Sequence, residues 1–156
     1  MYSTKVAVHI KAPREAVYRA LTDAGAIAYW RVPDGMSTHV HEFDAREGGR
    51  FRVSLSYADP TTAGKSAGHT DTYHGHFAEL VPNERVVEVL EFESDDPALA
   101  GTMTMTTTLT AADDGTAVVL LQEGVPDVVP VADNETGFRM ALEKLAKLVE
   151  SGQRSP

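Results

Sequence analysis

The chain has 156 residues, with 14 basic and 23 acidic side chains, a formal net charge of −9 and no cysteine. This acidic balance, without a basic cluster, argues against a nucleic-acid partner, and the lack of cysteine excludes disulfides, a catalytic thiol and thiolate metal sites. No apolar run is long enough to span a bilayer, and no export signal is recognisable at the N-terminus. We therefore expect one cytoplasmic domain over residues 1–156, with no membrane partner.

The first part of the chain predicts one strand followed by two short helices. Apolar residues alternate over Thr4 to Ile10, as in a half-buried strand. Pro13 suits a helix start because it has no N–H to leave unpaired. Helices are expected over Pro13 to Leu21 and over Ala24 to Trp30, and Pro33-Asp34-Gly35 indicates the turn after them.

The middle of the chain predicts an antiparallel meander. Turn signals such as Asp113-Asp114-Gly115 separate alternating segments, and Asp59 to Asp71 shows no periodicity and is expected to be a long loop. The six expected strands are His39 to Asp44, Arg50 to Tyr57, Thr72 to Val81, Arg85 to Glu93, Thr102 to Ala111 and Thr116 to Glu123.

A long amphipathic helix is expected over Asp133 to Ser151, capped by Asp133 or Asn134 and stopped by Gly152. A single broad apolar stripe needs an apolar partner, so the sheet of six or seven strands should curl around this helix. The predicted fold class is α+β. Because one helix cannot fill the inside of such a sheet, a cavity is expected between them.

Two histidine pairs, His39-Val40-His41 and His74-Gly75-His76, have the i, i+2 spacing that places both rings on one face of a strand. If Ala78 and Leu80 face inward, His74 and His76 do too. Convergent imidazoles could hold zinc or iron, but spacing alone is a weak argument. We expect no metal and no cofactor. His41 and His76 are expected instead to make polar contacts to a ligand. The alternative is that both histidine pairs face water.

Glu88 shares its strand face with Val86, Leu90 and Phe92, so it could point into an apolar space. A carboxyl group there would have a raised pKa and could act as a general acid or base. A water-facing position at the sheet edge is the simpler interpretation. The side chains expected to line a pocket are Trp30, Phe51, Val53, Tyr73, Met103, Met105 and Phe138, although each could equally be ordinary core.

Four segments, in order, resemble the helix-grip (START-like, Bet v 1-like, SRPBCC) superfamily, and most closely its activator of Hsp90 ATPase homologue 1-like branch. They are APREAVYRALTDAGAIAYW, HEFDAREGGRFRV, YHGHFAELVPNERVVEVLEF and ETGFRMALEKLAKLVE. Phe138 stands where the branch usually has Trp. The resemblance implies a cavity for a small apolar ligand between helix and sheet, in a superfamily of lipid and hormone carriers, polyketide cyclases and co-chaperones.

Three functions follow as hypotheses. The first is binding of a small lipid-, polyketide- or aromatic-like molecule by a monomer or weak homodimer. The second is a cyclase- or hydrolase-type enzyme that uses the same pocket, with His76 or Glu88 as acid/base. The third, implied only by the branch name, is a binding module associated with the Hsp90-type chaperone ATPase, and nothing in the sequence outside the domain supports it.

Overall fold

The computed structural model describes residues 1–32, 35–58 and 70–153, and its centre is a seven-stranded antiparallel sheet in the order β1-β7-β6-β5-β4-β3-β2. Its strands are β1 (Tyr2–Ile10), β2 (Met36–Phe43), β3 (Arg50–Tyr57), β4 (Thr70–Val81), β5 (Arg85–Phe92), β6 (Met103–Ala112) and β7 (Gly115–Val125). The helices are α1 (Arg14–Leu21), α2 (Ala24–Trp30), α3 (Val131–Gln153) and the short 3-10 helix η1 (Pro97–Leu99). The predicted α+β helix-grip architecture is confirmed.

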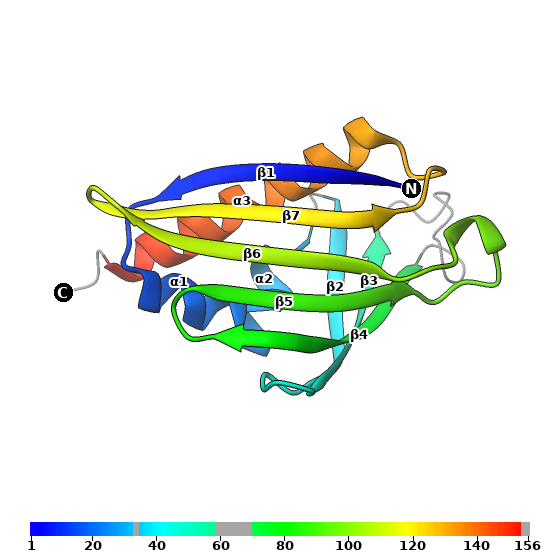
Figure 1. Ribbon diagram of the computed structural model, residues 1–156, viewed down its shortest axis with the longest axis horizontal. Coiled ribbons are helices and arrows are strands. Elements are labelled where there is room, and N and C mark those ends of the chain that lie inside the picture. The colour runs from blue at the N-terminus through cyan, green and yellow to red at the C-terminus, as the bar shows by residue number, and fades with distance from the viewer. Residues whose placement is uncertain (33–34, 59–69, 154–156) are drawn as a thin grey trace.

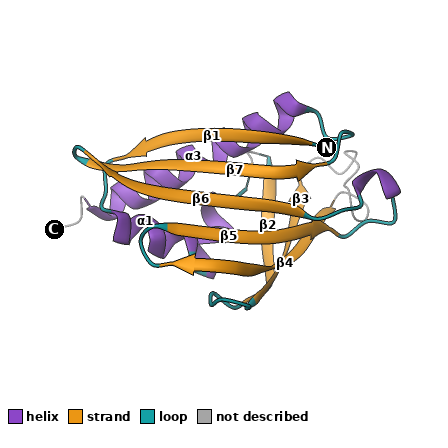
Figure 2. Ribbon diagram, viewed as in Figure 1, coloured by secondary structure: helices purple, strands orange, loops and turns teal. Residues whose placement is uncertain are grey.

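Helix α3 lies along one face of the sheet, behind β1, β7 and β6 in the view of Figures 1 and 2. Its apolar stripe and the inward residues of the strands form a single buried cluster, as the two periodicities predicted. The cluster includes Leu142, Leu145 and Val149 of α3 with Ile10 and Val118 of the sheet. This contact fixes which face of the sheet is the inner one.

Helices α1 and α2 close one end of the space under the sheet. The Trp30 indole N–H donates to the carbonyl oxygen of Ala20 at 2.9 Å, and Trp30 is almost fully buried. Lys144 of α3 donates to the carbonyl oxygen of Val32 at 2.7 Å, just after α2. Trp30 is therefore an anchor between the two short helices.

The sheet curls strongly, and Figure 1 shows β2 and β3 running across the direction of β6 and β7. Register shifts interrupt β2 between Val40 and Glu42 and β4 between Phe77 and Glu79. Such bulges add a residue to one strand and increase its twist and bend. They also reverse the inward–outward alternation of the strand beyond them.

Several predicted boundaries differ from the observed ones. Helix α3 begins at Val131, directly after Pro130, and continues through Gly152, so the predicted cap at Asp133 or Asn134 and the stop at Gly152 were wrong. β2 begins at Met36 rather than His39. The predicted turn at Pro33-Asp34 and the loop over residues 59–69 lie outside the described residues. Among the described helices, none is both long and apolar enough to cross a membrane.

Candidate ligand-binding cavity

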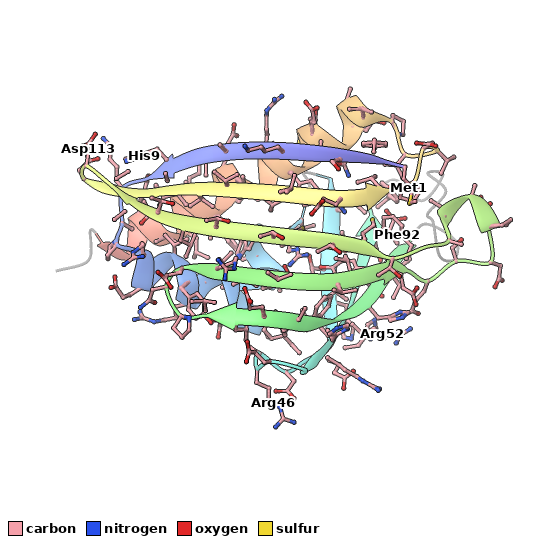
Figure 3. The ribbon with its side chains drawn as sticks, in the orientation of Figure 1. Met1, His9, Arg46, Arg52, Phe92 and Asp113 are labelled. Atoms are coloured by element: carbon pink, nitrogen blue, oxygen red, sulfur yellow. The ribbon has the colours of Figure 1, made fainter. Side chains whose placement is uncertain are left out.

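A cavity of about 740 Å³ lies between α3 and the inner face of the sheet. It reaches the surface beside the segment that joins β7 to α3, where Val128 is exposed. Figure 3 labels Phe92, one of the lining residues, at the same end of the sheet as Met1. The described lining residues are Arg31, Met36, Leu55, Tyr57, Asp71, Tyr73, Leu90, Phe92, Asp96, Leu99, Met103, Met105, Gln122, Val128, Val129, Pro130, Asp133, Asn134, Thr136, Gly137, Phe138, Met140 and Ala141.

Strand alternation explains the apolar walls. On β6, Met103 and Met105 are buried and face the cavity, while Thr104 and Thr106 lie on the other face. Phe138 and Ala141 face them from α3 at helical spacing. Thioether and aromatic walls adapt to the shape of an apolar ligand because methionine side chains change conformation easily.

A buried ion pair lies at the inner end of these walls. Arg31, the residue that ends α2, donates from Nη1 to Oε1 of Glu88 on β5 at 2.6 Å, and the two side chains are 10% and 5% exposed. Its Nη2 contacts the Met105 sulfur at 3.6 Å, and its Cζ lies 5.6 Å from the centroid of the Tyr73 ring. Burial lowers the pKa of Arg31, but Glu88 and Tyr73 outweigh it and the pKa is raised, so the guanidinium stays charged.

Tyr73 places a hydroxyl group beside this pair. Burial raises the pKa of Tyr73; Arg31 opposes that rise and Glu88 adds to it, so the phenol stays protonated at neutral pH. No described residue forms a hydrogen bond with this hydroxyl, which leaves it available to a molecule in the cavity.

A second cluster of polar side chains connects four elements along another wall of the cavity. Thr4 of β1 donates to Oδ1 of Asn134 at 2.5 Å, and Asn134 Nδ2 donates to Oε1 of Gln122 at 3.1 Å. Gln122 Nε2 then contacts the Met103 sulfur at 3.3 Å. Because these amides are engaged with one another, this wall is held in a fixed conformation.

The sequence model of the family described as "Activator of Hsp90 ATPase homolog 1-like protein" matches residues 11–150, which is most of the chain. The chain belongs to this family. A search of curated proteins gives no significant match.

Solved structures of other proteins resemble the chain over most of its length. A crystal structure of a protein from Chromobacterium violaceum is 34% identical, with a TM-score of 0.85 over 96% of this chain and 97% of that one. A solution structure of a family member from Aeromonas hydrophila is 21% identical, with a TM-score of 0.72 over 97% and 94%. A crystal structure from Rhodobacter sphaeroides, 19% identical, has a TM-score of 0.79 over 96% and 93%; these last two likenesses concern the fold alone.

In this family member, the predicted wall residues divide into two groups. Tyr73, Met103, Met105 and Phe138 line the cavity. The other three are buried in the core but are not among the lining residues, so their assignment to the cavity wall was wrong: Trp30, Phe51 and Val53. Trp30 is used to join α1 to α2, as described above.

Glu88 is 4% exposed, so the water-facing interpretation of this residue was wrong. Its strand neighbours Val86 and Leu90 are buried on the same face, as the alternation indicated. Arg31 was not predicted from the sequence; it pairs with Glu88 and itself lines the cavity.

His41 and His76 are exposed on the outer face, so the prediction that they reach the cavity was wrong. His76 was placed inward by assuming that Ala78 faces inward, but Ala78 is the exposed extra residue of the β4 bulge. His41 falls in the β2 bulge, and its Nε2 lies 2.8 Å from the Ser54 hydroxyl oxygen. Within the described ranges, no group of three or more histidine or acidic side chains is placed to hold a metal ion.

The outer face carries a polar network in place of the predicted histidine contacts. His74 lies between Glu91 and Glu93 at 2.9 and 3.0 Å, and Arg52, labelled in Figure 3, donates two hydrogen bonds to Glu93 at 2.8 and 2.9 Å. A second hollow of about 740 Å³ lies beside these residues. Its lining includes several exposed charged side chains, so the inner cavity with its apolar walls is the better ligand site.

We expect that the stability of the fold will depend less on pH in the acid range when Glu93 is replaced. The hydrogen bond from Arg52 lowers the pKa of Glu93, partly opposed by burial and helped by His74. A carboxyl group whose folded pKa is depressed stabilises the fold above its unfolded pKa, and this contribution disappears as pH falls through the folded pKa. In thermal unfolding, Glu93→Gln should therefore melt slightly below wild type at pH 7 and by a smaller margin at pH 3. Glu84→Gln, at an exposed turn, is the control, and an equal deficit of Glu93→Gln at both pH values would contradict the expectation.

Proposed function

We propose that the protein binds a small, largely apolar organic molecule in the cavity between α3 and the sheet. The observation that carries the proposal is the cavity of about 740 Å³, whose walls are mostly apolar and which has Arg31 and Tyr73 at its polar end. Ligand pockets of about 300–1,000 Å³ with apolar walls and a few oriented polar groups are typical of small-molecule sites. A cytoplasmic carrier acting as a monomer or weak homodimer is the form that we propose.

The arrangement favours binding over catalysis. His76, one of the two acid/base candidates, is on the opposite face of the sheet from the cavity. Glu88, the other, is paired with Arg31 and is not among the lining residues. A cyclase or hydrolase would need a group that reaches the reacting atom, so neither residue supports that alternative as placed.

The family name suggests a chaperone-associated role as the other candidate. The exposed large apolar side chains among the described residues are Met1, Tyr29, Val128 and Val131. Val128 lies at the cavity mouth, where an apolar ligand would enter. A pull-down with an Hsp90-type ATPase separates the two proposals, because a docking module would bind it with the cavity blocked.

Filling the cavity should abolish ligand binding. Ala141 is buried on α3 and lines the cavity, so the Ala141→Phe ring would occupy space that a ligand needs. We expect the affinity for a neutral fluorescent apolar probe such as N-phenyl-1-naphthylamine to fall at least tenfold, measured by titration. Ala7→Phe, at an exposed position on the outer face of β1, is the matched control and should bind as wild type does.

Native mass spectrometry of protein from its own host gives an independent test. A stoichiometric organic mass that is released on denaturation would support the proposal and identify the ligand class. A bare chain mass, together with unchanged probe binding in Ala141→Phe, would overturn it.

A further inference from the structure

The hydrogen-bonding groups at the inner end of the cavity restrict the chemical class of ligand that the cavity can bind. This inference rests on the proposed function. Arg31 has one described oxygen partner, Glu88, and one weak acceptor, the Met105 sulfur. A guanidinium has more N–H donors than these two contacts occupy, and the cavity is the side from which Arg31 is accessible. Together with the Tyr73 hydroxyl, the site offers hydrogen-bond donors that lack a strong acceptor among the described residues.

The charges around the cavity are not those of a carboxylate site. Glu88, at 2.6 Å, already neutralises Arg31, which is the only cationic side chain among the described lining residues. Three further carboxylates line the cavity from the described part of the chain: Asp71, Asp96 and Asp133. A carboxylate ligand would lose its hydration and gain no net positive field from the described lining residues in return, which makes its burial costly.

A neutral acceptor avoids that cost. A carbonyl oxygen can accept from Arg31 or Tyr73 without displacing Glu88, and a hydrogen bond to a charged donor is among the stronger ones. An apolar ligand with no acceptor would leave the donors unpaired in a partly buried site, which is also unfavourable.

We propose that the cavity selects neutral ligands in which an apolar, aromatic-sized body carries one hydrogen-bond acceptor, such as a ketone, ester or quinone oxygen, and that it discriminates against carboxylates. Arg31 and Tyr73 recognise the acceptor, Met103, Met105 and Phe138 contact the body, and Glu88 sets the preference for a neutral ligand.

The test uses three probes with one ring system: 2-acetylnaphthalene, 2-naphthoate and 2-ethylnaphthalene. Calorimetric titration of the full chain at pH 7 should rank the ketone first, with the hydrocarbon and the carboxylate each at least about tenfold weaker. A carboxylate that binds as tightly as the ketone would overturn the inference, and so would equal binding of all three probes. If none binds and no fluorescent probe binds either, the proposed function itself fails.

Glu88→Gln tests the role assigned to the paired carboxylate. The amide keeps a similar shape but leaves the charge of Arg31 uncompensated, so the affinity for 2-naphthoate should rise at least tenfold relative to 2-acetylnaphthalene. Glu91→Gln, on the outer face of the same strand, should leave the ranking unchanged. An unchanged ranking in a folded Glu88→Gln protein would overturn the assignment; the wild-type ranking remains decisive if that variant does not fold.

Discussion

Gly75→Ala should destabilise the protein by about 3 kcal/mol, near the upper end of what overpacking costs in a well-packed structure. Gly75 lies inside β4, where it pairs with Phe51 of β3 and Leu90 of β5. A Cβ at this position would overlap the carbonyl oxygen of Val89 and would lie 2.8 Å from the Cα of Leu90. These are backbone atoms of β5 and cannot rotate away, so the two strands would have to separate.

Thermal and denaturant unfolding measure this effect, and a loss of about 3 kcal/mol corresponds to a melting temperature lower by roughly 10 °C for a chain of this size. Gly152→Ala is the matched control, because a Cβ there meets no other atom within 4 Å and alanine is the better helix former. A Gly75→Ala protein as stable as Gly152→Ala would show that β4 and β5 can move apart at little cost.

The Gly75→Ala substitution should also change the arrangement of residues at the cavity. Leu90, opposite Gly75, lines the cavity, and Glu88 lies two residues earlier on β5, opposite Phe77. Separating the strands at Gly75 would therefore shift Glu88 relative to Arg31, which follows α2. The close approach at Gly75 thus helps to hold the ion pair in place.

The elements were predictable from the sequence because their hydrophobic periods are regular. Met103, Met105 and Leu109 alternate with threonines along β6, and all three are buried. Leu142 and Leu145 fall on one stripe of α3 and are buried too. A period of two or of 3.6 residues identifies an element and its buried face without any tertiary information.

The side chains on β4 were not predictable in the same way, because one extra residue reverses the alternation. Tyr73 and Phe77 face inward, and Ala78 is then inserted in the bulge, so Leu80 packs on the core while His76 is exposed. Small residues such as Ala78 occur at bulges and in regular strands alike. The prediction for His76 failed at this one residue, and the bulge at His41 in β2 had the same effect there.

Arg31 was missed for a different reason. It lies at the end of α2, outside any strand alternation, and its partner Glu88 is distant in the sequence. The local signal was an arginine directly after the apolar run that ends in Trp30 and before Val32, both of which are buried. Such a residue is either a helix cap that faces water or a buried partner of an acidic residue, and only the packing of α2 against the sheet decides between them.

Removing one partner of the Arg31–Glu88 ion pair should cause the second large loss of stability. Glu88→Ala leaves the charged Arg31 without its oxygen partner in a site where its side chain is 10% exposed. Removing one partner of a buried ion pair typically costs about 3–5 kcal/mol, because the remaining charge is desolvated and uncompensated. We expect about 3 kcal/mol, at the low end, since Arg31 borders a cavity that can admit water.

The double variant Arg31→Met/Glu88→Leu separates the cost of an unpaired charge from the value of the pair. Replacing both charges with apolar side chains removes the desolvation penalty, so the double variant should be more stable than Glu88→Ala in urea unfolding. Glu91→Ala, at the half-exposed contact with His74 on the outer face, should cost no more than about 1 kcal/mol. If the double variant is instead the least stable of the three, the pair itself stabilises the fold. A third outcome is a double variant that is stable but shows no preference for a ketone over a hydrocarbon of the same shape. That result would mean that the ion pair serves ligand recognition and that apolar side chains at both positions would give a more stable protein.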